Sequence, residues 1–195
     1  AVGNLTQKSL VQGSSLLTET YVYDKMNRMS SKTNALDETT RYAYDARGYK
    51  TAEADARYAP LAAYVETAPG LRYAYDANGN LTTTSIYNGT SESILEKKEY
   101  DGRGNIVKVM DGSHAAAGQG AVYAYNAQNL PVSYTPASSA SGQPARTMEY
   151  NGCGWMTGQT EYSDSDTAYN TYYGYRGDGM LTYVQHPDLG TEWYE

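Results

Sequence analysis

One short motif recurs along the whole sequence and limits the folds that the chain can adopt. Its clearest copy is YAYDANGNLT, residues 73–82, and the pattern is an aromatic residue, any residue, Tyr, Asp or Asn, two residues, then Gly or Asn. The second tyrosines of seven copies are separated by 21, 31, 25, 25, 25 and 25 residues. Self-similarity at a fixed period indicates a structural unit that is repeated along the chain.

The copies are distributed along nearly the whole sequence. They occupy residues 21–30, 42–51, 73–82, 98–107, 123–132, 148–157 and 173–182. The longest interval predicts an insertion, within residues 52–70. Gly3-Asn4-Leu5-Thr6 matches the last part of a still earlier copy. We therefore expect residues 1–195 to form a single array of repeats.

Each copy of the motif predicts a β-hairpin. The first aromatic residue and the following Tyr are two positions apart, so in a strand they share one face. The Asp or Asn side chain can bond the backbone two residues on, and Gly or Asn tolerates a positive φ. This combination favours a type I turn closed by a left-handed residue. The residues expected to build the repeats are Tyr23, Asp24, Tyr44, Asp45, Gly48, Tyr75, Asp76, Gly79, Tyr100, Asp101, Gly104, Tyr125, Asn126, Tyr150, Asn151, Gly154, Tyr175 and Gly179.

A second set of turns is expected half a period away, at Asn88-Gly89, Asp111-Gly112, 138–143 and 187–190. Each unit then holds two strands of about eight or nine residues and two turns. The predicted fold is all-β, an antiparallel meander of consecutive hairpins with about fourteen strands and about 25 residues per repeat. Such a long sheet must twist, so we expect a spiral sheet or part of a β-shell. Within the Ala-rich residues 51–66, either a helix split by Pro60 or a disordered loop is expected.

The composition predicts a thin core made largely of tyrosine. The chain has 22 Tyr, no Phe, and few branched aliphatic residues. Tyrosine supplies apolar area but carries a hydroxyl that needs water or a partner. The residue between the paired tyrosines is small in most copies and is Glu99 or Glu149 in two. We therefore expect the face opposite the tyrosines to meet water or a lumen.

Charge and hydropathy argue against two classes of partner. The formal net charge is −7, whereas a nucleic-acid-binding surface is usually basic. The sequence has neither a long apolar run nor a secretory leader, so we expect no membrane insertion. The single cysteine, Cys153, excludes an internal disulfide and is expected in a turn.

The sequence offers little for catalysis, a metal or a cofactor. We expect His114 and His186 to be loop residues without acidic or cysteine neighbours at ligand spacing. Asp76-x-Asn78-x-Asn80 resembles the start of a calcium loop, but Leu81 stands where that loop needs Gly, and Tyr87 where it needs Glu. We therefore predict no catalytic residues, no metal site and no cofactor, and we expect that the chain is not an enzyme.

The motif Tyr-x-Tyr-Asp-x-x-Gly-Asn-Leu-Thr, clearest at residues 73–82, resembles the YD repeat, also called the Rhs repeat. The resemblance covers nearly the whole chain in seven copies. The family includes bacterial Rhs polyvalent toxins, shell subunits of Tc toxin complexes, bacterial wall-associated proteins and animal teneurins. The resemblance implies a long β-sheet that spirals into a hollow shell, which in the toxins encloses a C-terminal effector.

The resemblance also shows what this sequence lacks. The toxin forms of the family end their shell with an Asp-Pro-x-Gly type signature, at which an aspartyl self-cleavage releases the effector. No Asp-Pro occurs here, and in residues 186–190 the Pro precedes the Asp instead of following it. No catalytic residue is therefore carried over from the family.

Three functions follow as hypotheses. The first is a structural segment of a secreted or cell-surface, bacterial shell that encloses or scaffolds a toxin or adhesion module. The second is a carbohydrate-binding or adhesive surface, because rows of tyrosine rings can stack on sugars. The third is self-assembly into an extracellular fibre or spiral through open sheet edges. The expected partners are the rest of a longer chain or neighbouring copies, together with an enclosed toxin domain or cell-surface glycans.

Overall fold

A computed structural model describes residues 3–54, 56–57, 65–137, 144–163 and 167–195. Its strands are β1 Gln7–Gln12, β2 Ser15–Tyr23, β3 Met29–Thr33, β4 Thr39–Tyr44, β5 Lys50–Ala54, β6 Gly70–Tyr75, β7 Leu81–Tyr87, β8 Glu92–Tyr100, β9 Ile106–Asp111, β10 Ala121–Tyr125, β11 Pro131–Thr135, β12 Ala145–Tyr150, β13 Met156–Tyr162, β14 Ala168–Tyr175, β15 Leu181–His186 and β16 Gly190–Trp193. The described residues also include two short 3-10 helices, η1 Val65–Thr67 and η2 Ala115–Ala117. Among the described residues, no helix combines the length and the apolar character needed to cross a membrane.

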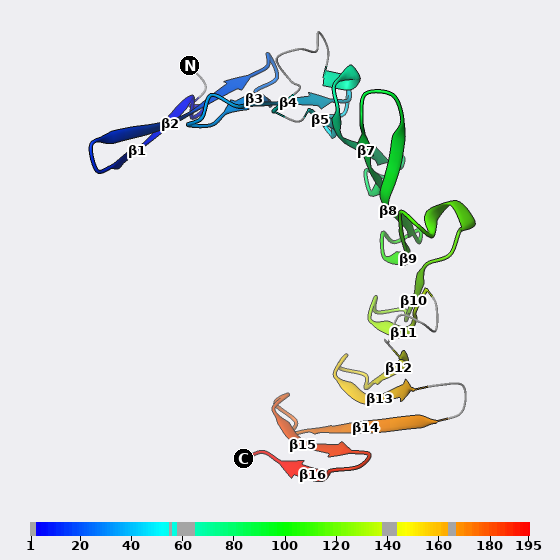
Figure 1. Ribbon diagram of the computed structural model, residues 1–195. Coiled ribbons are helices and arrows are strands. Elements are labelled where there is room, and N and C mark those ends of the chain that lie inside the picture. The colour runs from blue at the N-terminus through cyan, green and yellow to red at the C-terminus, as the bar shows by residue number, and fades with distance from the viewer. Residues whose placement is uncertain (1–2, 55, 58–64, 138–143, 164–166) are drawn as a thin grey trace. The chain divides into compact units, whose positions relative to one another are not determined.

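The strands form an antiparallel meander, which confirms the predicted fold class. Their order in the sheet is their order in the chain, from β1 to β16 (Figure 1). The described residues contain sixteen strands rather than about fourteen. Two compact units can be distinguished, Ala1–Lys97 and Lys98–Glu195.

Most strands are shorter than the sequence predicted. Only β2, β8 and β14 reach eight or nine residues, and the other strands described have four to seven. The prediction was wrong because it allowed too few residues for the motif turn. In the turn between β6 and β7, for example, residues 76–80 all lie outside the strands.

Strand register is the same in every repeat, although the intervals between motifs differ. The residue four positions after the closing Gly or Asn of a turn pairs with the residue three positions before the next motif tyrosine. These pairs are Gln7 with Thr20, Ser31 with Arg41, Ala52 with Arg72, Thr83 with Lys97, Lys108 with Val122, Ser133 with Thr147, and Gly158 with Tyr172. Differences in repeat length are therefore absorbed on the half-period side of each repeat, at the turns and, between β7 and β8, also at a one-residue register shift next to Thr84 and Ser85.

The 31-residue interval illustrates this point. Residues 51–54 continue β5, so the prediction of a helix or loop beginning at residue 51 was wrong for them. Ala54 pairs with Gly70 at the start of β6, and the single turn of η1 lies between them. Residue 55 and residues 58–64 lie outside the described residues.

The other half-period turns follow the prediction where they are described. Asn88 and Ser91 close one turn through a backbone hydrogen bond of 3.1 Å. Asp111 begins another, which continues into η2, and residues 187–189 connect β15 to β16. The predicted turn at residues 138–143 lies outside the described residues.

The core is small, as the composition predicted. In the first unit Ala52, Ala54 and Ala68 are buried, and in the second unit Met110 and Val184 are buried. The motif tyrosines are half-buried instead. Such a sheet depends on contacts between neighbouring strands more than on a central core.

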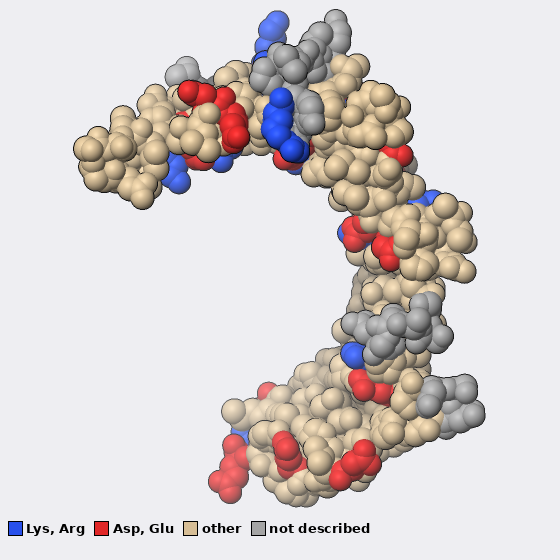
Figure 2. Space-filling model, viewed as in Figure 1, with Lys and Arg blue, Asp and Glu red and all other residues tan. Residues whose placement is uncertain are grey.

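The two faces of the motif strands differ in exposure. The residue between the paired tyrosines is exposed at Val22, Ala74, Glu99, Ala124 and Glu149, which agrees with the expectation that this face meets solvent or a lumen. Charged side chains form small separate groups on a largely uncharged surface (Figure 2). The sequence distributes its charge unevenly, since residues 1–97 have ten Lys and Arg against eleven Asp and Glu, whereas residues 98–195 have five against eleven.

Candidate functional site

The motif turns are the most regular feature of the structure, and their polar side chains bond the backbone. The Oδ1 atom of Asp76 accepts the N–H groups of Asn78 and Asn80, both at 2.9 Å. In other motif turns, the Asp or Asn side chain likewise accepts the backbone N–H groups of the residues two and four positions later. These side chains are Asp24, Asp45, Asp101, Asn126 and Asn151. Each turn is thus closed locally by one side chain.

The closing residue of each turn adopts the left-handed conformation. Gly79 has φ +88°, while Asn27 and Asn129, which replace Gly in their copies, have φ +62° and +61°. The strand pairing shifts register next to six of the motif turns, for example between Ala74 and Tyr75. This shift places a β-bulge at the motif tyrosine, which increases the local twist.

The turn carboxyls bind protons weakly because their charged form is hydrogen-bonded. The Asn80 side-chain amide is the largest of the influences that lower the pKa of Asp76, and Asn105 has the same role for Asp101. At Asp45, partial desolvation is the largest influence and raises the pKa, but the hydrogen bonds from Tyr49 and Arg47 outweigh it and the pKa is lowered.

We expect Asp76→Asn to weaken the acid sensitivity of the fold. Because the folded pKa of Asp76 is lowered, its stabilisation is complete above the unfolded pKa of about 3.9 and is lost as the pH falls through the folded pKa. The variant should melt below wild type near neutral pH, because the Asn80 amide loses a charged acceptor, and this difference should shrink in acid. Melting temperatures from about pH 7 to about pH 2 measure the effect.

The reverse variant Asn126→Asp supplies the control for this experiment. Asn126 makes the same two backbone bonds without a titratable group, so the variant should gain the acid sensitivity that Asp76→Asn loses. Identical acid profiles for wild type and both variants would contradict the role given to the turn carboxyls.

In five motifs the hydroxyl of the second tyrosine is seen to bond the chain just after the turn of the preceding repeat. The hydroxyl donates to the backbone carbonyl two positions after that turn's closing residue. The described bonds of this kind are Tyr23 to Leu5 at 3.0 Å, Tyr44 to Met29 at 2.8 Å, Tyr75 to Lys50 at 3.0 Å, Tyr125 to Ile106 at 2.9 Å and Tyr150 to Pro131 at 2.8 Å. Burial raises the pKa of Tyr44, Tyr75 and Tyr150, so these hydroxyls stay protonated and can donate.

Arginine side chains also connect neighbouring turns. Arg28 donates to the backbone carbonyl of Asp45 at 3.0 Å, and its guanidinium lies 4.8 Å from the centre of the Tyr44 ring. Arg47 donates to the carbonyl of Asp76 at 3.0 Å. These bonds cap carbonyls of the next turn, a role that the motif pattern did not reveal because the arginines occupy different positions in it.

Large side chains that follow a closing residue pack on the next repeat. The ring of Tyr49 lies on Gly79 and stacks on Tyr75, with ring centres 4.9 Å apart. Trp155 lies on Gly179 in the same way, 3.0 Å from the position that a Cβ would take, and its ring centre is 5.5 Å from that of Tyr175. The sequence signal for this contact is a bulky residue immediately after the closing Gly. Tyr49 lies 26 positions before Tyr75, and Trp155 lies 20 positions before Tyr175.

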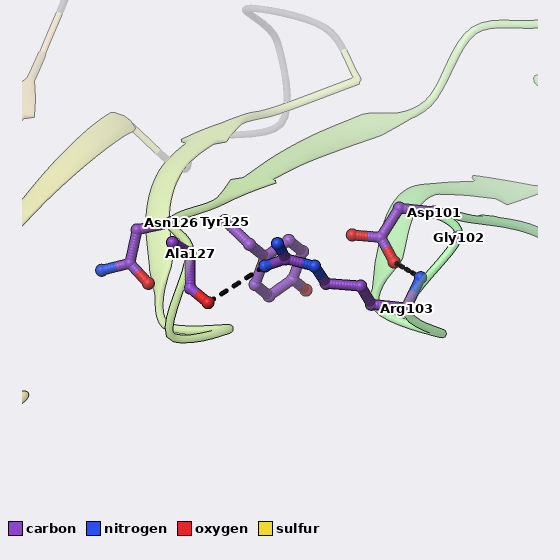
Figure 3. A pocket seen from close by; sticks show the side chains of 6 residues that line it. All are labelled: Asp101, Gly102, Arg103, Tyr125, Asn126 and Ala127. Carbon is purple, nitrogen blue, oxygen red and sulfur yellow. Dashed lines mark hydrogen bonds between the residues drawn. The ribbon is translucent and has the colours of Figure 1, made fainter.

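A pocket of about 500 Å³ lies between two consecutive turns of the second unit (Figure 3). Its lining consists of Asp101, Gly102, Arg103, Tyr125, Asn126 and Ala127. The Asp101 carboxylate accepts three hydrogen bonds from its own turn, and Arg103 donates to the carbonyl of Ala127 at 3.0 Å. Since these polar groups bond within their own turn or to the next turn, the pocket is part of the contact between successive repeats.

The last motif turn departs from the others because Arg176 occupies the Asp position. Asp178, two residues later, accepts the N–H of Met180 at 3.1 Å and bonds the Arg176 guanidinium at 2.7 Å. Gly179 keeps φ +90°. The carboxylate that helps close this turn was missed in the sequence because it lies at a different position in the motif.

The histidines have acidic neighbours, contrary to the prediction. His114 Nδ1 lies 2.9 Å from Asp111 Oδ1, and His186 Nε2 lies 3.8 Å from Glu192. The Ser113 hydroxyl and the His114 ring together lower the pKa of Asp111 to about 2. His186 is also the last residue of β15 rather than a loop residue. Within the described part of the chain, no three His, Cys, Asp or Glu side chains are grouped so that they could hold a metal ion.

Comparison with known proteins finds similarity at the level of the fold. No protein-family profile matches the sequence, and no curated protein does. Among solved structures, a chain of the Photorhabdus luminescens Tc holotoxin pore with a mutation in TccC3 aligns over 88% of this chain, with a TM-score of 0.60 and 18% sequence identity. A crystal structure of TcdB2-TccC3-TEV aligns over 92%, with a TM-score of 0.48 and 13% identity.

The matched proteins are much longer than this chain. It spans 9% of the matched chain of the holotoxin pore and 11% of that of TcdB2-TccC3-TEV. At 18% identity, the first of these matches establishes a shared fold. The chain therefore has the β-sheet fold found in one stretch of a Tc toxin chain.

Proposed function

We propose that this chain is a structural segment of a secreted or cell-surface β-shell of the Rhs/YD-repeat type, whose task is to enclose or scaffold a toxin or adhesion module. The observation that carries the proposal is the set of tyrosine hydroxyl bonds between successive repeats. Each of these hydroxyls bonds a backbone carbonyl of the preceding repeat, so the recurring tyrosine of the motif is used to hold the sheet together.

The fold shared with a stretch of a Tc toxin chain supports this proposal. So does the use of the pocket residues, because Asp101 and Arg103 bond within and between turns. On this proposal the partners are other strands of the same wall, an enclosed toxin domain is the cargo, and no residue of the chain takes part in catalysis.

The mass of the native polypeptide that contains these residues tests the proposal. Denaturing mass spectrometry of material from the natural source should give a mass several times the 21.3 kDa of this chain, because one array of repeats is too small to enclose a domain. A native mass near 21.3 kDa would overturn the enclosing role and leave self-assembly or surface binding as the function.

A recognition surface is the second candidate, and exposed aromatic side chains in the second unit favour it. Tyr172 is 46% exposed and Trp193 is 74% exposed. Rings presented in this way can stack on sugars of a cell surface. This candidate predicts that substituting an exposed ring changes sugar binding without changing stability.

A further inference from the structure

In the first unit, a positively charged side chain joins a tyrosine ring to a carboxylate. The Lys50 Nζ atom lies 2.7 Å from Glu53 Oε2 and 4.8 Å from the centre of the Tyr73 ring. The ammonium group is attracted both by the carboxylate and by the electron-rich face of the ring. The chain thus builds an ammonium site from a ring and a carboxylate and fills it with its own lysine.

The second unit contains a ring and a carboxylate without such a lysine. Glu149 in β12 pairs with Gly158 in β13, and Gly158 pairs in turn with Tyr172 in β14. Side chains of directly paired residues lie on the same face of a sheet, so Glu149 and Tyr172 flank Gly158 on the face opposite the motif tyrosines. A Cβ added to Gly158 would lie 3.5 Å from Glu149 Oε2 and 3.7 Å from Tyr172 Cδ1. Because Gly158 has no side chain, it leaves the space between the carboxylate and the ring open.

This carboxylate and this ring are both exposed and without partners. Tyr172 is 46% exposed, and Glu149 is exposed as well. Neither side chain forms a hydrogen bond, an ion pair or a ring contact within the described part of the chain, whereas Glu161 of the same hairpin pairs with Arg146 at 3.0 Å. β12, β13 and β14 each have a neighbouring strand on both sides, so the exposure belongs to the face of the sheet and not to an edge.

Another motif copy with glutamate in this place has a lysine where Gly158 stands. Glu99 corresponds to Glu149, and Lys108 corresponds to Gly158, because each of the latter two lies four positions after the closing glycine of its turn and pairs with the next motif strand. The copy with Glu149 therefore has the carboxylate without the ammonium group that Lys108 brings to the other copy.

The charge of the second unit favours a positively charged partner. Residues 98–195 have five Lys and Arg against eleven Asp and Glu. Two of these five, Arg146 and Arg176, already pair with acidic side chains of the chain. A partner with several positive charges therefore gains more from this surface than a single small cation does.

We propose that the space above Gly158 binds the ammonium group of a lysine side chain from a basic partner polypeptide. Glu149 forms the ion pair, and the Tyr172 ring presents its face to the ammonium group, as Glu53 and Tyr73 do for Lys50 within the first unit. This inference goes beyond the wall role, because it concerns recognition of a partner by one face of the sheet. It also differs from sugar binding, because it requires a positive charge on the ligand.

Calorimetric titration of the 195-residue chain with an acetylated and amidated pentalysine peptide tests the site. At low ionic strength we expect binding that weakens as salt is added. Glu149→Gln and Tyr172→Ala should each weaken it roughly two- to fivefold, the size expected for one exposed ion pair or one exposed cation–π contact.

Gly158→Thr fills the proposed space without changing the charge of the chain. Thr83 occupies the corresponding position in another copy, and the added Cβ would make ordinary contacts at 3.5 and 3.7 Å, so the variant should melt as wild type does. We expect it to weaken pentalysine binding at least as much as Glu149→Gln. Unchanged binding by a folded Gly158→Thr variant would overturn the proposal.

Glu99→Gln is the matched control for charge, because it removes one carboxylate from the same motif position in the copy that has Lys108. Its affinity for pentalysine should stay close to that of wild type. Equal losses in Glu99→Gln and Glu149→Gln would overturn the site, because overall negative charge would then explain the binding.

Choline chloride is the second probe, since it carries a single ammonium group and no polypeptide. Binding of choline as tight as that of pentalysine would overturn the assignment to a polypeptide partner. Failure of pentalysine to bind at low ionic strength would overturn the site itself. The wall role would then stand, because the mass of the native polypeptide tests it separately.

Discussion

Replacing Gly79 by alanine is expected to destabilise the first unit by about 3 kcal/mol. Two costs combine in this value. The residue has φ +88°, a conformation that costs an L-residue roughly 1–2 kcal/mol. An added Cβ would also collide with the hydroxyl and ring of Tyr49, and displacing a packed side chain costs about 1–3 kcal/mol. Urea unfolding followed by circular dichroism measures the free energy of unfolding.

Gly48→Ala is the matched control, because Gly48 has a similar φ of +96° but no atom within 4 Å of its added Cβ. We expect it to cost only the conformational part, about 1 kcal/mol. The difference between the two variants then measures the packing of Tyr49 on the next repeat. Equal losses in both would show that this packing contributes nothing to stability.

The sequence predicted the fold well because its strongest signals are local. Alternation around paired tyrosines predicts strands, and the Asp or Asn with a Gly or Asn three positions later predicts the turn. Each turn is closed by its own side chain, as Asp76 illustrates, so no distant contact was needed to foresee it. Since successive hairpins join neighbouring strands, the order of the sheet follows as well.

Contacts between repeats could not be predicted from the sequence, because they depend on which residues meet across about 20 to 30 positions. The bond from Tyr75 to Lys50 joins residues 25 positions apart, and the bond from Arg47 to Asp76 joins residues 29 apart. The pattern also gave no reason for Gly174, whose missing side chain leaves room for the ring of Tyr183 opposite it.

The wall proposal and the recognition proposal make opposite predictions for individual tyrosines. Tyr75→Ala is expected to lower the free energy of unfolding by about 2–3 kcal/mol, somewhat less than the loss of a fully buried aromatic side chain. The variant loses both the stack on Tyr49 and the hydrogen bond to Lys50. Thermal melting and urea unfolding of the same variant measure this loss.

Tyr75→Phe separates the two contributions, since it keeps the stacked ring and removes only the hydroxyl. It should cost about 1 kcal/mol, the usual value of one hydrogen bond. Tyr172→Ala, at a tyrosine that is 46% exposed, should change stability by less than about 0.5 kcal/mol. If Tyr172→Ala instead abolished binding to a glycan array while Tyr75→Ala left stability unchanged, the tyrosines would serve recognition and the wall role would fail.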